Sequence, residues 1–159
     1  MSAEMTDVKQ LCTFSVAGLL FGVEVIHVQE VIRYQEMTPV PLAPKVVSGL
    51  INLRGRIVTA LDLRERLSLP RRDPDQLPTN VVVRHAEGVL SLLVDEIGDV
   101  VDVDAASFEM PPDTLIPAAR ALIDGVYKLK PQLLLLLNTE RAVGVETHGD
   151  RDRNEHDHQ

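Results

Sequence analysis

The chain has 159 residues, 45% of them hydrophobic, which suits one domain, or two small halves sharing a core. Only five residues are aromatic, so Val, Leu and Ile must supply that core, and Val and Ile favour strands. The formal net charge of -8 argues against surfaces that bind nucleic-acid phosphates or anionic lipid.

The cysteine content and the N-terminus indicate where the protein works. Cys12 is the single cysteine and cannot form an internal disulfide, which favours a reducing compartment. The first ten residues have mixed charges and do not resemble a signal peptide. No apolar stretch reaches the ~20 residues that a membrane-spanning helix needs. We therefore expect a cytoplasmic protein, with residues 1–8 and 149–159 as flexible termini.

In chain order, the alternation of residues predicts a strand over about 10–17, then a turn, then a second strand over 19–26. Residues 27–32 break this alternation, and their apolar side chains recur at helical spacing, so one helical turn is predicted there. Residues 37–44 contain three prolines, which predicts a loop or an extended segment.

The stretch 49–64, GLINLRGRIVTALDLR, consists of two apolar runs around Arg54 and Gly55. This pattern predicts a tight hairpin, because glycine accepts the positive φ that such turns need. The hairpin would present Arg54 outward at its tip. The alternative is that Arg54 is only a solvated turn residue, since turns are polar in most proteins without a functional reason.

The second half of the chain repeats this alternation of strands and turns. A charged, proline-rich stretch precedes it, and the run of five leucines within it predicts a strand that is apolar on both faces. Asn138 predicts a helix N-cap near the end. The predicted elements are a hairpin over 80–94, a strand over 97–103, a loop with a helical fragment over 105–121, and strands over 122–129 and 132–137.

An internal repeat relates the two halves. Residues 49–62 align without a gap to residues 125–138, and the tip position of the second copy is Lys130. Residues 28–32 align to residues 97–101 at nearly the same offset. We interpret the chain as two copies of one small β unit packed against each other.

The predicted boundaries follow from the repeat and from the polar stretch between its copies. We expect one domain over 9–145, made of subdomain 1 (about 9–68), a linker (about 69–79) and subdomain 2 (about 80–145).

Catalytic and metal-binding motifs have little support in this sequence. It contains no phosphate-binding glycine loop and no nucleophile motif, and its histidines are isolated or lie in the tail. Nothing in the sequence brings its scattered carboxylates, such as Glu24, Asp62, Asp95 and Glu96, together in a cleft. We therefore predict no enzyme activity, no metal and no cofactor, which leaves surface recognition of a partner protein.

The sequence motifs within 49–64, GLINLRGRIV followed by LDLR, resemble the signature of CheW-type coupling proteins of bacterial chemotaxis. VEV and VQEVI within 23–32, the prolines of 39–44 and LVDEI at 93–97 support the resemblance. It extends over about residues 9 to 145.

The resemblance implies an all-β fold of two five-stranded SH3-like barrels, with short helices, packed on a shared core. It implies a non-enzymatic adaptor that couples the cytoplasmic tip of chemoreceptors, the methyl-accepting chemotaxis proteins, to the regulatory domain of the CheA histidine kinase. By motif, the receptor-binding residues would be Val28, Glu30, Val31, Arg54, Gly98 and Val100, and the kinase or partner surface would include Gly49, Asn52 and Gly55. We also hypothesise an ion pair between Glu30 and Arg54.

Two alternatives remain open from the sequence. The first is a coupling protein of a pilus or another non-flagellar chemosensory pathway. The second, from another class, is a small β-barrel that binds nucleic acid or a small ligand, although the negative charge and the few aromatic residues disfavour nucleic acid.

Overall fold

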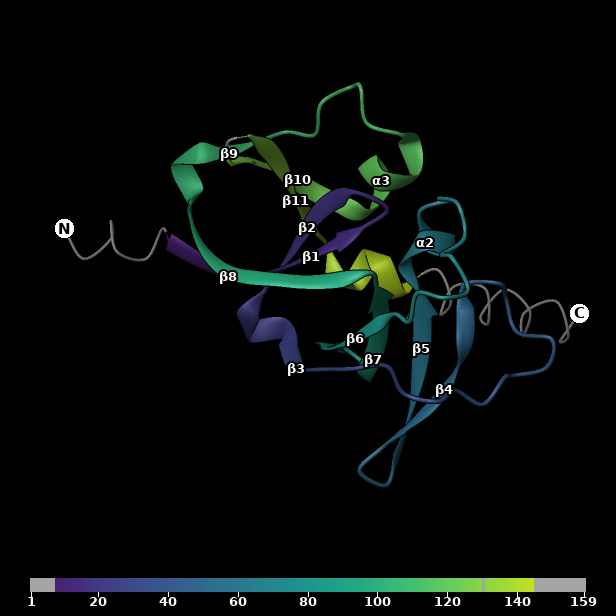
Figure 1. Cartoon of the computed structure of the whole chain (residues 1–159). Coiled ribbons are helices and arrows are strands. Elements are labelled where there is room, and N and C mark those ends of the chain that lie inside the picture. Colours follow the sequence, from purple (N-terminus) through teal and green to yellow (C-terminus); the bar gives the residue numbers. More distant parts are fainter. Residues whose placement is uncertain (1–7, 130, 145–159) are drawn as a thin grey trace, which may run out of the picture.

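The computed structural model describes residues 8–129 and 131–144, which form two β-sheets (Figure 1). The expected flexible termini lie outside the described residues, apart from residue 8. The six-stranded sheet has the order β8 (Glu96–Asp104), β1 (Val8–Val16), β2 (Leu19–Glu24), β11 (Gln132–Leu137), β10 (Ile123–Leu129) and β9 (Phe108–Glu109). The five-stranded sheet has the order β3 (Val28–Ile32), β6 (Thr79–His85), β7 (Gly88–Val94), β5 (Arg56–Asp62) and β4 (Val47–Leu53).

The helices are short and lie at the ends of strands. They are the 3-10 turns η1 (Val25–His27) and η2 (Ala105–Ser107) and the α-helices α2 (Leu63–Arg66) and α3 (Pro117–Leu122). Residues 139–144 are also helical, and the backbone N–H of Arg141 donates to Asn138 Oδ1 at 2.9 Å, which confirms the predicted N-cap. Within the described ranges, no helix has the length and apolar content to cross a membrane.

The two sheets repeat one strand order, which confirms the internal repeat. Apart from the two-residue β9, the strands β8, β1, β2, β11 and β10 take the same places as β3, β6, β7, β5 and β4. In both sheets the only parallel contact joins the third and fourth of these strands, β2 to β11 and β7 to β5. The aligned segments 28–32 and 97–101 are both on edge strands, as a true repeat requires.

The division of strands between the sheets differs from the subdomain boundaries expected from the sequence. The hairpin β1–β2 belongs to the first repeat in sequence, but it pairs with the strands of the second repeat, within residues 96–137. The hairpin β6–β7 belongs to the second repeat, but it pairs with β3 and β5 in the sheet of the first repeat. The stretch 69–79 therefore connects two parts of the same sheet instead of two halves of the protein. The repeats exchange their first hairpins, which makes each sheet depend on both.

A shared core fills the space between the sheets. Phe14, Phe21 and Val23 from the six-stranded sheet belong to the same buried cluster as Val81 and Leu92 from the five-stranded sheet. A smaller cluster fills the inside of each sheet's curve. The leucine run of β11 contributes to both kinds of cluster, since Leu135 and Leu137 lie in the shared core while Leu134 and Leu136 face the other way. The prediction of a strand apolar on both faces is confirmed.

One predicted element is wrong. Residues 28–32 form the strand β3 and not a helical turn, because their backbone pairs with β6, from Val28 opposite Val83 to Ile32 opposite Asn80. The helical turn lies just before them, at η1. Hydrogen bonds to β6, about fifty residues later in the sequence, make this segment a strand. The spacing of its side chains gives no information about these bonds.

Candidate interaction surface

The β4–β5 hairpin ends in a tight turn whose conformation the sequence dictates. Arg54 and Gly55 have φ values of 55° and 86°, so both central residues are left-handed, as in a type I′ turn. The backbone N–H of Gly55 donates to Asn52 Oδ1 at 2.8 Å and fixes the turn. The hairpin projects from the rest of the molecule (Figure 1, bottom), and the Arg54 side chain is 80% exposed. The predicted outward arginine is confirmed.

Arg54 and Glu30 form an ion pair, as hypothesised. Arg54 Nη2 lies 3.2 Å from Glu30 Oε1. Glu30 belongs to β3, at one edge of the five-stranded sheet, and Arg54 follows β4, at the opposite edge. A contact between opposite edges requires the sheet to curl, so the pair lies where the barrel closes.

Val31 and Val100 lie on the edge strands of different sheets and are 38% and 58% exposed. Val31 pairs with Val81 of the shared core. Val100 pairs with Cys12, which in turn pairs with Val23 of the same core. Directly paired residues share a face of a sheet, so both valines lie on the faces that the sheets turn toward each other. They therefore sit at the rim of the seam between the sheets.

The remaining predicted residues have structural roles of their own. Val28 is half-buried and packs against the shared core. Gly98 is exposed, at a register irregularity between β1 and β8, where a Cβ atom would lie 2.5 Å from Thr13 Oγ1. The Thr13 hydroxyl donates to the carbonyl oxygen of Asp99 at 2.6 Å, so the close approach at Gly98 is built into this edge.

Gly49 does not lie on the surface. It is buried, and a Cβ atom there would meet the carbonyl oxygen of Thr38 at 2.7 Å. Thr38 and Leu50 exchange two backbone hydrogen bonds of 2.9 and 2.8 Å across this contact. The prediction that Gly49 belongs to a binding surface is therefore corrected. Gly49 is covered by the chain around Thr38, and its missing side chain allows that close contact.

A charge cluster around Asp95 is the main feature that the sequence did not predict. Arg64 donates to both carboxylate oxygens of Asp95, from Nε at 3.0 Å and from Nη2 at 2.6 Å, and Arg72 Nε donates at 2.9 Å. The backbone N–H of Ala17 adds a bond of 2.7 Å. Burial alone would raise the pKa of Asp95, but the bonds from Arg64, Ala17 and Arg72 lower the pKa on balance. The cluster ties the β1–β2 turn to α2 and to the stretch that follows it.

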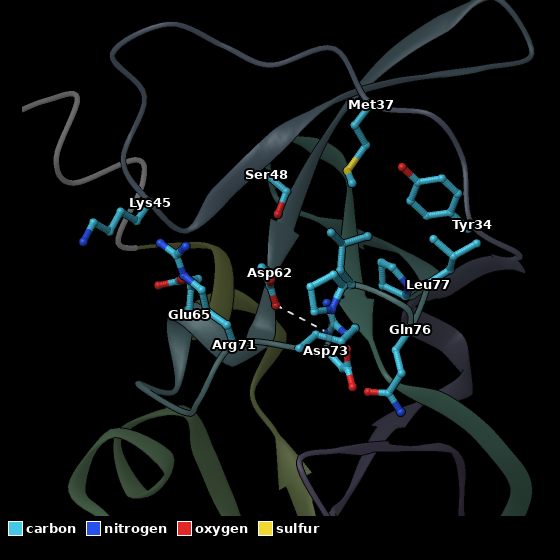
Figure 2. A pocket seen from close by; sticks show the side chains of 14 residues that line it. Tyr34, Met37, Lys45, Ser48, Asp62, Glu65, Arg71, Asp73, Gln76 and Leu77 are labelled. Carbon is cyan, nitrogen blue, oxygen red and sulfur yellow. Dashed lines mark ion pairs between the residues drawn. The ribbon is translucent and has the colours of Figure 1, made fainter.

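A cleft of about 350 Å³ lies beside this cluster (Figure 2). Tyr34, Met37 and Leu77 gather on one side of it, while Glu65 and Arg71 lie on the other. Asp62 in its centre is 3.5 Å from Arg72 Nη2, and Arg71 Nε is 3.4 Å from Glu65. Both carboxylates are thus paired with arginine, so neither is a free base for acid–base chemistry. Residues 8–129 and 131–144 contain no group of three or more His, Cys, Asp or Glu side chains that could hold a metal ion.

Two sheets of one strand order that share a core, one of them with an exposed charged turn, define an all-β protein built from two like halves. The family described as the CheW-like domain matches residues 10–146. The chain therefore belongs to the CheW-like domain family, and its function is that of a chemotaxis coupling adaptor.

Individual relatives agree with this family. The chain is 26% identical to "Chemotaxis protein CheW" of Bacillus subtilis, over 92% of this chain and 94% of the relative. It is similar to the crystal structure of the scaffolding protein TtCheW from Thermoanaerobacter tengcongensis, with a TM-score of 0.74, 28% identity, and coverage of 82% and 88% of the two chains. Protein PilI of Pseudomonas aeruginosa is 29% identical over 72% of this chain but only 64% of its own length. The fuller coverage favours the chemotaxis proteins as the functional guide.

Proposed function

We propose that this adaptor couples the cytoplasmic tip of chemoreceptors to the regulatory domain of a CheA-type histidine kinase, and that it catalyses no reaction itself. The proposal includes a cytoplasmic location, which both partners require. The ion pair between Glu30 and Arg54 supports it best, because it shapes an exposed turn beside the seam between the sheets.

The receptor-binding surface would combine this pair with the valines at the seam. An apolar stripe of a receptor helix would contact Val31 and Val100, with half-buried Val28 beneath them and exposed Gly98 on the same edge strand as Val100. Polar groups of the helix would meet Arg54 and Glu30 at the rim. Partly exposed valines on two edge strands support this choice, because burial of their remaining apolar area would stabilise such a complex.

The ion pair would contribute orientation more than affinity. Arg54 is largely exposed, and exposed pairs stabilise proteins by only about 0–1 kcal/mol. Charge placement at the rim of an interface governs partner choice and association rate. Asn52 and Gly55 would belong to the same surface through the turn that they fix, and they are the exposed members of the predicted kinase or partner surface.

Calorimetric titration of a receptor-tip fragment into the full chain tests the proposal. Arg54→Glu should weaken binding by about tenfold, because it reverses the charge at the rim and repels Glu30. The double variant Glu30→Arg with Arg54→Glu restores an ion pair of opposite polarity, which separates loss of the pair from loss of the arginine itself.

Arg56→Glu is the matched control. Arg56 is exposed in the same hairpin, but it makes no ion pair with any described residue. Receptor binding by Arg56→Glu should stay within about twofold of the parent chain. Equal binding by the parent and Arg54→Glu chains would show that the receptor contacts another surface.

A further inference from the structure

The loop between β3 and β4 presents a leucine in a conformation and an environment that leucine disfavours. Leu42 is 97% exposed, the most exposed large hydrophobic residue within the described part of the chain. Its φ is 65°, in the left-handed region that is costly for residues with a Cβ atom. An observed outlier of this kind is a reason to look for a function.

A local β-turn explains the positive φ of Leu42, but it does not explain why a leucine occupies this position. The backbone N–H of Ala43 donates to the carbonyl of Val40 at 3.3 Å, so residues 40–43 form a β-turn with Pro41 second and Leu42 third. A turn with a positive φ at the third position normally carries Gly or Asn there. Leucine therefore weakens the turn while gaining no burial within the chain.

The base of the loop is held firmly. Thr38 and Leu50 exchange two backbone hydrogen bonds, and the backbone N–H of Val47 donates to the carbonyl of Pro44 at 2.9 Å. Three prolines restrict the segment between these anchors. Buried Gly49 permits the close approach of Thr38. The loop is thus a preorganised support for one exposed aliphatic side chain, and preorganisation lowers the entropic cost of binding.

We propose that Leu42 is a contact residue for the second protein of the complex, the kinase regulatory domain, and that Gly49 positions its loop. This inference rests on the proposed function. Leu42 would enter an apolar pocket large enough for one aliphatic side chain, with an acidic rim that faces exposed Lys45.

The position of the loop favours the kinase over the receptor. β4 begins at Val47, beside the loop, and ends at Leu53, beside the Arg54 turn. Seven residues of strand separate the two ends by roughly 20 Å. Figure 1 shows the loop and the hairpin tip projecting in different directions. Contacts at opposite ends of one strand allow two partners to bind together.

A protein partner also fits the charges better than a membrane does. The chain carries a formal charge of -8, and a negative protein is repelled by the anionic surface of the inner leaflet. Residues 37–44 contain no charged side chain, so the loop surface around Leu42 is suited to an apolar pocket on a protein.

Leu42→Asn in the full chain separates this contact from a structural role. Asparagine tolerates the left-handed conformation, so the melting temperature should equal or exceed that of the parent chain. Calorimetric titration of the purified kinase regulatory domain should show binding about tenfold weaker, as loss of one buried aliphatic side chain predicts. Binding of the receptor-tip fragment should remain within about twofold.

Two further variants complete the test. Leu42→Met keeps an aliphatic side chain and should bind the kinase domain within about threefold of the parent chain. Met110→Asn is the control, because Met110 is 76% exposed but belongs to the other half of the molecule. It should change neither affinity.

Several results would overturn the inference. Normal kinase-domain binding by Leu42→Asn would do so, as would a binding loss accompanied by a lower melting temperature. A change confined to phosphatidylserine vesicle binding, or to self-association in sedimentation, would assign the loop to a membrane or a second copy. If the parent chain binds both partners and Leu42→Asn matches it, only this inference fails. If the parent chain binds neither, the proposed function fails as well.

Discussion

The hairpins β4–β5 and β10–β11 occupy matching places in the two sheets, yet the first projects from the molecule with β4 as a sheet edge, while the second lies between β2 and β9 (Figure 1). Ile57, near the tip of β5, is 64% exposed, whereas its counterpart Leu133 in β11 is half-buried and packs against the shared core. β9 also pairs with β10. Lys130, the counterpart of Arg54, lies outside the described residues. One copy of the unit thus serves mainly as scaffold, while the other presents the exposed turn.

The matched glycines of the two hairpins give the largest expected effect. A Cβ atom at Gly125 would lie 2.3 Å from the Phe108 ring and 2.5 Å from the Glu109 carbonyl oxygen. Gly125→Ala should therefore destabilise the fold by about 3 kcal/mol, measured by urea unfolding. Gly49→Ala meets the Thr38 carbonyl oxygen at 2.7 Å, and the positive φ of 158° at Gly49 adds backbone strain, so this variant should also destabilise the fold. A loss below about 1 kcal/mol for Gly125→Ala would mean that the packing around Gly125 is not tight.

Asp95→Asn should give the next largest loss. It removes the carboxylate that two largely buried arginines share, although Arg72 keeps its contact with Asp62, and breaking such a buried pair costs about 3 kcal/mol. Urea unfolding at pH 7 measures this cost. Receptor-tip affinity, relative to folded protein, should change little.

The pH dependence of the same variant follows from the lowered pKa of Asp95. The stabilisation is complete above the ordinary carboxyl pKa of 3.8 and is lost as the pH falls through the lower folded-state pKa. The difference in unfolding free energy between parent and variant should therefore shrink below about pH 3.8. A difference that stays constant from pH 7 to pH 2.5 would show that the charge of Asp95 is not its source.

The exposed hairpin was predictable because its signals are local. Two apolar runs around Arg54 and Gly55 specify a two-residue turn, and the pairing of Leu53 with Arg56 confirms it. The repeat was predictable for the same reason. The ion pair between Glu30 and Arg54 followed from the family resemblance and not from either segment alone.

The features that were missed depend on contacts between distant residues. β3 is a strand because β6 pairs with it. The exchange of hairpins between repeats rests on parallel pairing of β5 with β7 and of β11 with β2, which no local pattern encodes. Arg64 and Asp95 are 31 residues apart and meet only after both sheets have formed.

Asn52→Ala tests how much of the exposed turn is fixed by its own hydrogen bond. The variant removes the acceptor for the Gly55 N–H, which lies in solvent and can bond to water instead. A loss of about 0.5–1 kcal/mol is expected in urea unfolding. Receptor-tip affinity should fall by a few-fold, because the turn then holds Arg54 less firmly. A loss above 2 kcal/mol would assign Asn52 a role in the core.

Arg54→Glu should have the smallest effect on stability. The arginine is largely exposed, so the free energy of unfolding should fall by less than about 1 kcal/mol. Urea unfolding alongside Arg56→Glu measures this. A larger loss would mean that the pair serves mainly to close the barrel.

Kinase activity in a reconstituted mixture of receptor, histidine kinase and this adaptor tests the central account most directly. The parent chain and Arg56→Glu should both support receptor-dependent kinase activation. Arg54→Glu, which should remain folded, should reduce that activation to near the level without adaptor. Full activation by Arg54→Glu would contradict the claim that the arginine-tipped hairpin of one repeat joins the receptor to the kinase.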